Sequence, residues 1–177
     1  MKWDYEFDVV VVGSGNGALT SALCSHDGGA KTLVIEKSDQ YGGTSATSGG
    51  GVWIPNNRYA KAENVDDSDQ DARDYINSVS PEGKIKDELV EIYIAEGPKM
   101  INYLHENSQV KYRNLPHYPD YFPDNPGGKA GNRSMEPEPI NGTKLGADLG
   151  RLREQHPQTA FTMGPIHMNF TQVEGQL

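Results

Sequence analysis

The sequence predicts an α/β fold: a Rossmann-like domain, incomplete within 177 residues, with an inserted helical segment and a long proline-rich loop. Three features indicate the Rossmann-like part. A β-branched strand is expected at residues 9–12, a glycine-rich turn follows it, and a second apolar strand at residues 32–35 leads into Glu36. A short, wholly apolar run is typical of a parallel strand buried on both faces. Together the three predict a dinucleotide-binding strand–turn–helix–strand unit.

The turn after the first strand has the spacing G-x-G-x-x-A. Its members are Gly13, Gly15 and Ala18, with Gly17 as an additional glycine. Diphosphate oxygens must approach backbone N–H groups closely, and glycine leaves these groups unshielded by a Cβ atom. The helix expected at residues 18–25 would turn its positive N-terminal end toward the same oxygens. The diphosphate-binding residues predicted here are Gly13, Ser14, Gly15, Asn16, Gly17 and Ala18.

Glu36 stands at the end of the second strand, about 20 residues after Gly15. At this distance a carboxylate can accept hydrogen bonds from the ribose hydroxyls of an adenosine. An ordinary strand–turn–helix can carry the same glycine spacing by chance. The agreement of strand, turn and acid favours dinucleotide binding over that alternative.

A second glycine-rich segment, residues 38–51, favours a flavin over a nicotinamide. A nicotinamide-binding half normally continues to another crossover helix and a third parallel strand. Here glycines alternate with small hydroxyl residues, which can wrap a second stretch of diphosphate and pass beneath a flat ring. A flexible linker is the alternative, but the segment leads into the apolar residues Val52, Trp53 and Ile54. FAD is the predicted cofactor, and its further ligands are Lys37, Gly43, Thr44, Ser45, Thr47, Ser48, Gly49, Gly50 and Gly51.

Composition excludes several classes of function. The net charge of −9 opposes binding to nucleic acid and to anionic membranes. No segment has the apolar length of a transmembrane helix, and the N-terminus leaves no room for a signal peptide. The single cysteine, Cys24, allows no internal disulfide. The histidines lack the paired spacing of metal ligands, so no metal is expected. These points predict a cytoplasmic protein.

Three segments are expected along the chain: residues 1–55 as the FAD-binding core, 56–113 as a helical segment of the same domain, and 114–177 as a truncated, loop-rich segment. In the helical segment, Ser68 is expected to cap a helix, and Gly97-Pro98 is expected to separate two further helices. Residues 114–143 contain six prolines spread between polar residues, which predicts a long loop.

Three stretches resemble a known family. They read GSGNGALTSAL, EKSDQYGGTSATSGGGVWIP and YPDYFPDNPGGKAGNRSMEPEPI. They are similar to the flavoprotein subunit superfamily of fumarate reductase and succinate dehydrogenase, and within it to the 3-ketosteroid dehydrogenases. The first two motifs are shared across the superfamily, and the third is selective for the ketosteroid branch. The resemblance spans most of residues 6–153. The order Thr44–Ser45 is a minor departure from the family pattern.

The resemblance implies a reaction and its residues. Two hydrogens would be removed from a carbon–carbon bond next to a ketone, with a steroid-like ketone as substrate and a separate electron acceptor as partner. Tyr118, or in second place Tyr121, would border the substrate and assist a second catalytic tyrosine that comes from much later in a longer chain. Because family members are several times longer, the chain is expected to be an N-terminal portion that does not turn substrate over alone.

Two other interpretations stay open. One is a fumarate reductase-like enzyme acting on small dicarboxylates, although the aromatic residues at 118–122 suit a flat apolar substrate better. The other is a non-catalytic truncated fragment. Each of the two tyrosines also fits a plain packing role.

Overall fold

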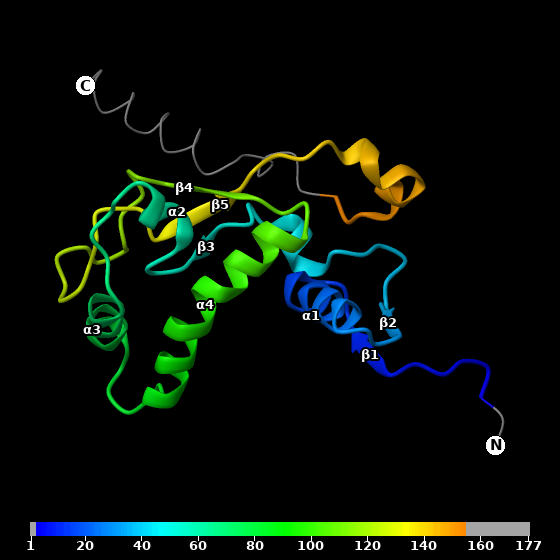
Figure 1. Ribbon diagram of the computed structural model, residues 1–177, viewed down its shortest axis with the longest axis horizontal. Helices are drawn as coiled ribbons and strands as arrows, with labels where there is room; N and C mark the ends of the chain where they lie inside the picture. The colour runs from blue at the N-terminus through cyan, green and yellow to red at the C-terminus, as the bar shows by residue number, and fades with distance from the viewer. Residues whose placement is uncertain (1–2, 155–177) are drawn as a thin grey trace. The chain divides into compact units, whose positions relative to one another are not determined.

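The structure is a computed structural model that describes residues 3–154, a mixture of helices and short strands (Figure 1). Within that range the chain forms two units. The first comprises residues 3–50 and 141–154, and the second comprises Gly51–Ile140. The predicted boundaries after residues 55 and 113 both fall inside the second unit, and residues 155–177 of the predicted third segment lie outside the described residues. The three-segment division therefore stays a prediction.

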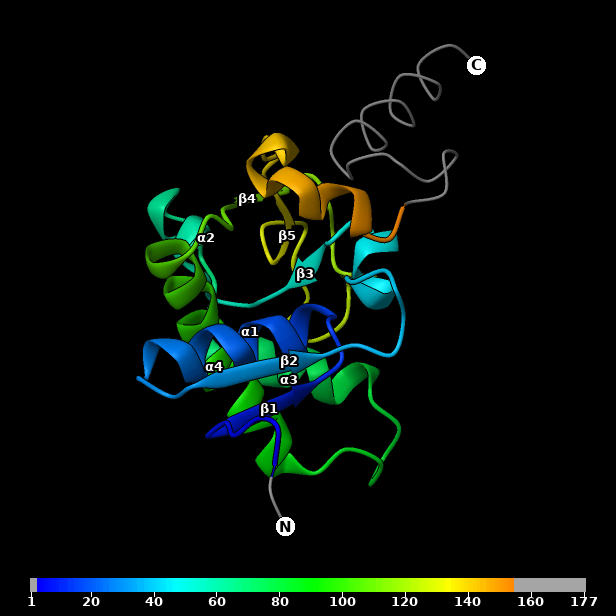
Figure 2. The ribbon, with the colours of Figure 1, turned by 90° about the vertical axis from the view of Figure 1, so that its right-hand side faces the viewer.

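The core of the first unit is a strand–helix–strand. Strand β1 (Val9–Val12) pairs in parallel with β2 (Thr32–Ile35), in a register that runs from Val9 opposite Thr32 to Val12 opposite Ile35. Helix α1 (Asn16–Asp27) connects the two strands and packs against both, as Figures 1 and 2 show. Both predicted strands are confirmed. The helix begins two residues earlier than expected, because Gly15 already has the extended backbone of an N-cap.

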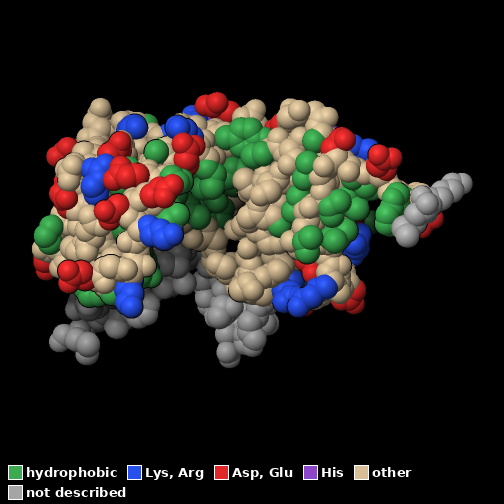
Figure 3. Space-filling view, turned by 90° about the horizontal axis from the view of Figure 1, so that it is seen from below, with side chains coloured by type: hydrophobic (Ala, Val, Ile, Leu, Met, Phe, Trp, Pro, Cys, Tyr) green, Lys and Arg blue, Asp and Glu red, His purple; other side chains and the backbone are tan. Residues whose placement is uncertain are grey.

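One face of this small two-stranded sheet is apolar and exposed. Val10 and Val12, which alternate onto the same side of β1, are 52% and 78% exposed. Figure 3 shows hydrophobic side chains gathered over the two strands. The expectation that the first strand is buried on both faces is therefore wrong for the described residues. Helix α1 covers one face, whereas a parallel sheet normally needs cover on both.

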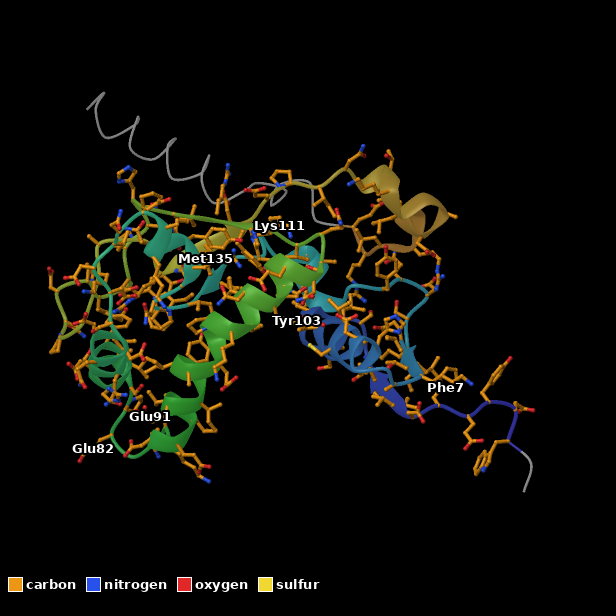
Figure 4. The ribbon with its side chains drawn as sticks, in the orientation of Figure 1. Phe7, Glu82, Glu91, Tyr103, Lys111 and Met135 are labelled. Carbon is orange, nitrogen blue, oxygen red and sulfur yellow. The ribbon has the colours of Figure 1, made fainter. Side chains whose placement is uncertain are left out.

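The second unit contains an antiparallel sheet with the order β3-β5-β4. Its strands are β3 (Val52–Trp53), β4 (Tyr112–Asn114) and β5 (Ser134–Pro137). Strand β5 lies inside the segment predicted to be one long loop, so that prediction is wrong there. The residues of β5 look polar in sequence, but Met135 is fully buried against Ile54, Ile101 and Tyr112, and Figure 4 labels it on the strand. The next residue, Glu136, is buried because it pairs with Arg113.

Three helices accompany this sheet: α2 (Arg58–Ala62), α3 (Asp69–Val79) and α4 (Asp87–Asn107). The predicted cap of α3 is confirmed: the Ser68 hydroxyl accepts a hydrogen bond from the Asp71 N–H at 3.1 Å and donates one to the Asp71 carboxylate at 2.8 Å. Helices α3 and α4 pack through Ala72, Val90 and Ile94. An ion pair also joins Arg73 of α3 to Glu91, which Figure 4 labels on α4.

Helix α4 runs through Gly97-Pro98 without ending, so the predicted break is wrong. An interior proline costs a helix about 3 kcal/mol, but each large apolar side chain that the helix buries contributes about 1.5–3 kcal/mol. Gly97 also has a packing role, because a Cβ atom there would lie 3.3 Å from the side chain of Ile54. The buried stripe that outweighs the proline is Val90, Ile94, Gly97, Ile101 and Leu104.

Candidate functional site

The glycine turn between β1 and α1 opens a backbone surface at the helix N-terminus. Gly13 has φ of +97°, a conformation that other residues rarely adopt, and its N–H donates to the Ile35 carbonyl at 2.7 Å. No side chain of its own turn caps α1. The positive end of the helix therefore meets a turn in which Gly13 and Gly15 carry no Cβ atom, which suits an anion such as a diphosphate.

The second glycine cluster folds onto this turn, within the same unit. A Cβ atom on Gly43 would lie 3.6 Å from both N and Cα of Gly15, so the two backbones are in close contact. The Ser45 hydroxyl accepts a hydrogen bond from the Asn16 N–H at 3.0 Å. Residues that are far apart in the chain thus meet at the start of α1, as a site for one extended dinucleotide requires.

Ser14 joins the two glycine clusters to Glu36. Its hydroxyl donates to a carboxylate oxygen of Glu36 at 2.5 Å and accepts from the Gly42 N–H at 2.9 Å, and the residue is only 3% exposed. The Ser14 hydroxyl, followed by the Ser38 N–H, holds the pKa of Glu36 below its usual value. The carboxylate therefore stays charged at neutral pH, as a hydrogen-bond acceptor for ribose hydroxyls must.

Replacing Ser14 with alanine should raise the pKa of Glu36 toward the ordinary value, because the largest stabilising hydrogen bond to the carboxylate is lost. The measurement is a carboxyl carbon NMR titration of the chain. Ser21→Ala is the matched control, since the Ser21 hydroxyl bonds only to the Gly17 carbonyl of its own helix. An unchanged titration of Glu36 in Ser14→Ala would contradict the assigned contact.

Apart from Gly51, which belongs to the second unit, the predicted cofactor ligands all lie in the first unit. Lys37, Thr44, Ser48 and Gly49 are exposed around the turn. Gly42 is not among the ligands predicted from the sequence, although its φ of +105° and the hydrogen bond from its N–H to the Ser14 hydroxyl make it part of the same arrangement. The Gly-Gly pair at 42–43 was the available signal for it. The role of each of these residues as an FAD ligand stays a prediction.

The two candidate tyrosines lie in the second unit, on the segment between β4 and β5. Tyr118 is half-buried, whereas Tyr121 is 83% exposed. Burial, and then the proximity of Tyr121 and a hydrogen bond to it, raise the pKa of Tyr118 above the usual tyrosine value. Tyr118 therefore keeps its proton at neutral pH, which suits a hydrogen-bond donor and disfavours a free phenolate base.

Replacing Tyr121 with phenylalanine should lower the pKa of Tyr118 part of the way toward the ordinary value. Two of its three causes involve the Tyr121 phenol, while burial of the Tyr118 ring stays. The measurement is a titration of 13Cζ-labelled tyrosine by NMR, with the Tyr118 signal assigned by its loss in Tyr118→Phe. Tyr5→Phe, at a residue that is 81% exposed, is the control. A Tyr118 titration that stays in place in Tyr121→Phe would show that the phenols do not interact.

Comparison with known proteins supports FAD as the cofactor. The family model described as FAD binding domain matches residues 8–171. The chain belongs to this family. FAD is accordingly its cofactor, and the bare glycine turn, the α1 N-terminus and the charged Glu36 fit a dinucleotide. None of the helices within residues 3–154 could cross a membrane, and no cluster of potential metal ligands occurs in that range.

Several relatives of this FAD-binding chain are similar over nearly its whole length. It is 39% identical over 168 residues to a 3-oxosteroid 1-dehydrogenase of Mycobacterium tuberculosis (strain ATCC 25618 / H37Rv), which covers 95% of this chain and 30% of the relative. It is 38% identical over 157 residues to a 4-oxocyclohexanecarboxylate 2-dehydrogenase of Sinomonas cyclohexanicum, covering 89% of this chain and 27% of the relative. The chain thus spans about a third or less of the curated relatives it matches.

A solved structure has the same fold. The chain superimposes with a TM-score of 0.87 on the 3-ketosteroid delta1-dehydrogenase of Sterolibacterium denitrificans, crystallised in complex with 1,4-androstadiene-3,17-dione. The sequence identity is 37%, and the match covers 94% of this chain and 30% of that protein. The chain therefore has the fold of one portion of a ketosteroid dehydrogenase-like flavoprotein.

Proposed function

We propose that this chain is the FAD-binding portion of a flavin-dependent dehydrogenase that oxidises a carbon–carbon bond next to a ketone, with 3-ketosteroids as its substrates. The observation that carries the proposal is the similarity of nearly the whole chain to ketosteroid dehydrogenases. Two tyrosines three residues apart, Tyr118 and Tyr121, lie between β4 and β5 and could supply hydrogen-bonding phenols, which FAD binding alone does not require. Proton removal beside a ketone does require hydrogen-bonding groups at the reacting carbon and its oxygen. The relatives' names support the substrate class, since they specify an oxosteroid and an oxocyclohexane acid.

The residues of the first unit would bind and orient the cofactor. The N–H groups at the start of α1 would contact the diphosphate, with Ser45 beside them, and Glu36 would accept hydrogen bonds from the ribose. When bound, FAD supplies the capacity to accept two electrons from the substrate. A separate electron acceptor completes the cycle.

The residues of the second unit would act on the proton. Tyr118 holds its proton and donates a hydrogen bond, which would stabilise the anion of a second tyrosine that the longer relatives supply. Tyr121 is the second candidate for the same role. Because the chain spans about 30% of its relatives, the remaining catalytic groups would come from the part of such a protein that this chain does not include.

The test is a visible absorption titration of the purified chain with FAD, followed by a 3-ketosteroid and, in parallel, by succinate. Saturable displacement of the flavin bands from those of free FAD, followed by a further change with the steroid and none with succinate, would support the proposal. A response to succinate in place of the steroid would favour the dicarboxylate alternative. An FAD spectrum that the chain never alters would contradict the proposal at its first step.

A further inference from the structure

A buried ionic cluster lies in the second unit and includes Asp120, which belongs to the segment that carries Tyr118 and Tyr121 (the tyrosine segment). Arg133 is 1% exposed, and its guanidinium donates to the Asp67 carboxylate at 2.7 Å and to the Asp120 carboxylate at 2.9 Å. The aromatic rings of Trp53 and Tyr75 lie 5.4 and 5.7 Å from the guanidinium carbon. Side chains from four separate segments therefore converge on one cation, which partners and stacked rings stabilise.

Asp120 is the member of this cluster that belongs to the tyrosine segment, one residue before Tyr121. Its carboxylate, 2% exposed, accepts three hydrogen bonds: from the Trp53 indole N–H at 2.6 Å, from Arg133 at 2.9 Å and from the Lys129 N–H at 3.0 Å. Its own backbone N–H donates to the Lys129 carbonyl at 3.0 Å. Both the side chain and the backbone of Asp120 are thus fixed, and this anchors the segment on which both tyrosines stand.

We propose that Asp120 is a positioning residue: its anchored carboxylate fixes the segment that carries Tyr118 and Tyr121, and joins that segment to β3. Asp120 itself is buried, with its carboxylate occupied by protein donors, so it acts through the tyrosines and not on a substrate. The indole hydrogen bond links Trp53, the last residue of β3, to Asp120, the residue before Tyr121. The catalytic meaning of this positioning rests on the proposed function, whereas the contact between the tyrosines does not.

The decisive variant is Asp120→Asn. An asparagine side chain keeps one acceptor oxygen. Its NH2 group then faces either the Trp53 indole N–H or both Arg133 and the Lys129 N–H, so the anchor cannot be satisfied. Arg133 keeps its paired contact with Asp67, so no unpaired buried charge is created. Asp124→Asn is the matched control, because Asp124 is an exposed carboxylate in the same loop.

The measurement is the 13Cζ-tyrosine titration of Tyr118, carried out as a double-mutant cycle. If Asp120 holds the two tyrosines in place, Asp120→Asn lowers the pKa of Tyr118. In the Asp120→Asn background, Tyr121→Phe then lowers the pKa of Tyr118 by less than it does in the unaltered chain. A merely structural role would loosen the ring's burial but leave the Tyr121 contribution additive. Full additivity, or a Tyr118 titration unchanged in Asp120→Asn, would overturn the proposal.

A milder variant covers the case in which Asp120→Asn does not fold. Trp53→Phe keeps a ring against Arg133 but removes the indole hydrogen bond to Asp120, and a smaller non-additive shift is expected in the same cycle. Additive behaviour there would overturn the proposal equally. The titration uses neither FAD nor steroid. If the chain failed to bind steroid, the proposed function would be contradicted, but the result for Asp120 would be unaffected.

Discussion

Replacing Arg133 with leucine should lower the free energy of unfolding of the chain by about 3–5 kcal/mol. The substitution leaves two carboxylates, Asp67 and Asp120, buried at 3% and 2% exposure without the cation that pairs with both. An uncompensated buried charge is among the few single changes that remove a large fraction of a domain's stability. Urea unfolding followed by far-UV circular dichroism measures the effect.

Arg73→Leu is the matched control for this prediction. Arg73 also forms a two-pronged pair, with Glu91, but their side chains are 31% and 51% exposed. Water screens such a pair, so its loss is expected to lower the free energy of unfolding far less than the loss of Arg133 does. If both substitutions lowered the free energy of unfolding by the same small amount, the buried cluster would not be a major source of the second unit's stability.

Replacing Gly15 with valine should weaken FAD binding by about 100-fold or more, which corresponds to about 2.7 kcal/mol. Gly15 has an ordinary φ of −72°, and a Cβ atom there would meet only the Ser45 hydroxyl, at 3.4 Å. The fold should therefore tolerate the side chain, while a diphosphate at the α1 N-terminus should not. Gly13 would be a poorer choice, since its φ of +97° makes any substitution strain the backbone itself.

Fluorescence titration with FAD, beside circular dichroism of the free chain, measures this prediction. Gly150→Ala is the control, because a Cβ atom there would meet no neighbouring atom within 4 Å. Equal FAD affinity in Gly15→Val and in the unaltered chain would place the diphosphate elsewhere.

The first unit could be predicted from sequence because its signals are local. A run of four valines, two glycines in a turn and an apolar strand ending in an acid each specify their own backbone. The Ser68 cap is local as well, since donor and acceptor are three residues apart. The exposure of Val10 and Val12 on one side of β1 was not predictable from the strand's own residues, because it depends on which elements cover the sheet.

The second unit resisted prediction where packing between distant residues outweighed local preference. Pro98 predicts a break, but the burial of Ile94 and Ile101 on either side keeps α4 continuous. Strand β5 contains a glutamate and a proline, and it forms because Met135 fills the space between Ile54 and Tyr112 and because Arg113 pairs with Glu136. The apolar stripe of α4 is visible in the sequence on both sides of Pro98, but whether its burial outweighs the proline depends on the tertiary structure. The contacts that form β5 join residues far apart in the chain, so no short window of sequence shows them.

Local sequence patterns are enough to predict the chemistry of the candidate cofactor site: bare backbone at Gly13 and Gly15 and a carboxylate at Glu36, at a spacing that a dinucleotide requires. The side chains that hold these groups in place can be identified only in the folded chain. Ser14 bonds to Glu36, 22 residues away, and Arg133 bonds to Asp67, 66 residues away. The reason is physical: a charged or hydroxyl side chain has the same sequence signature whether water or a buried partner satisfies it, and only the fold supplies the partner.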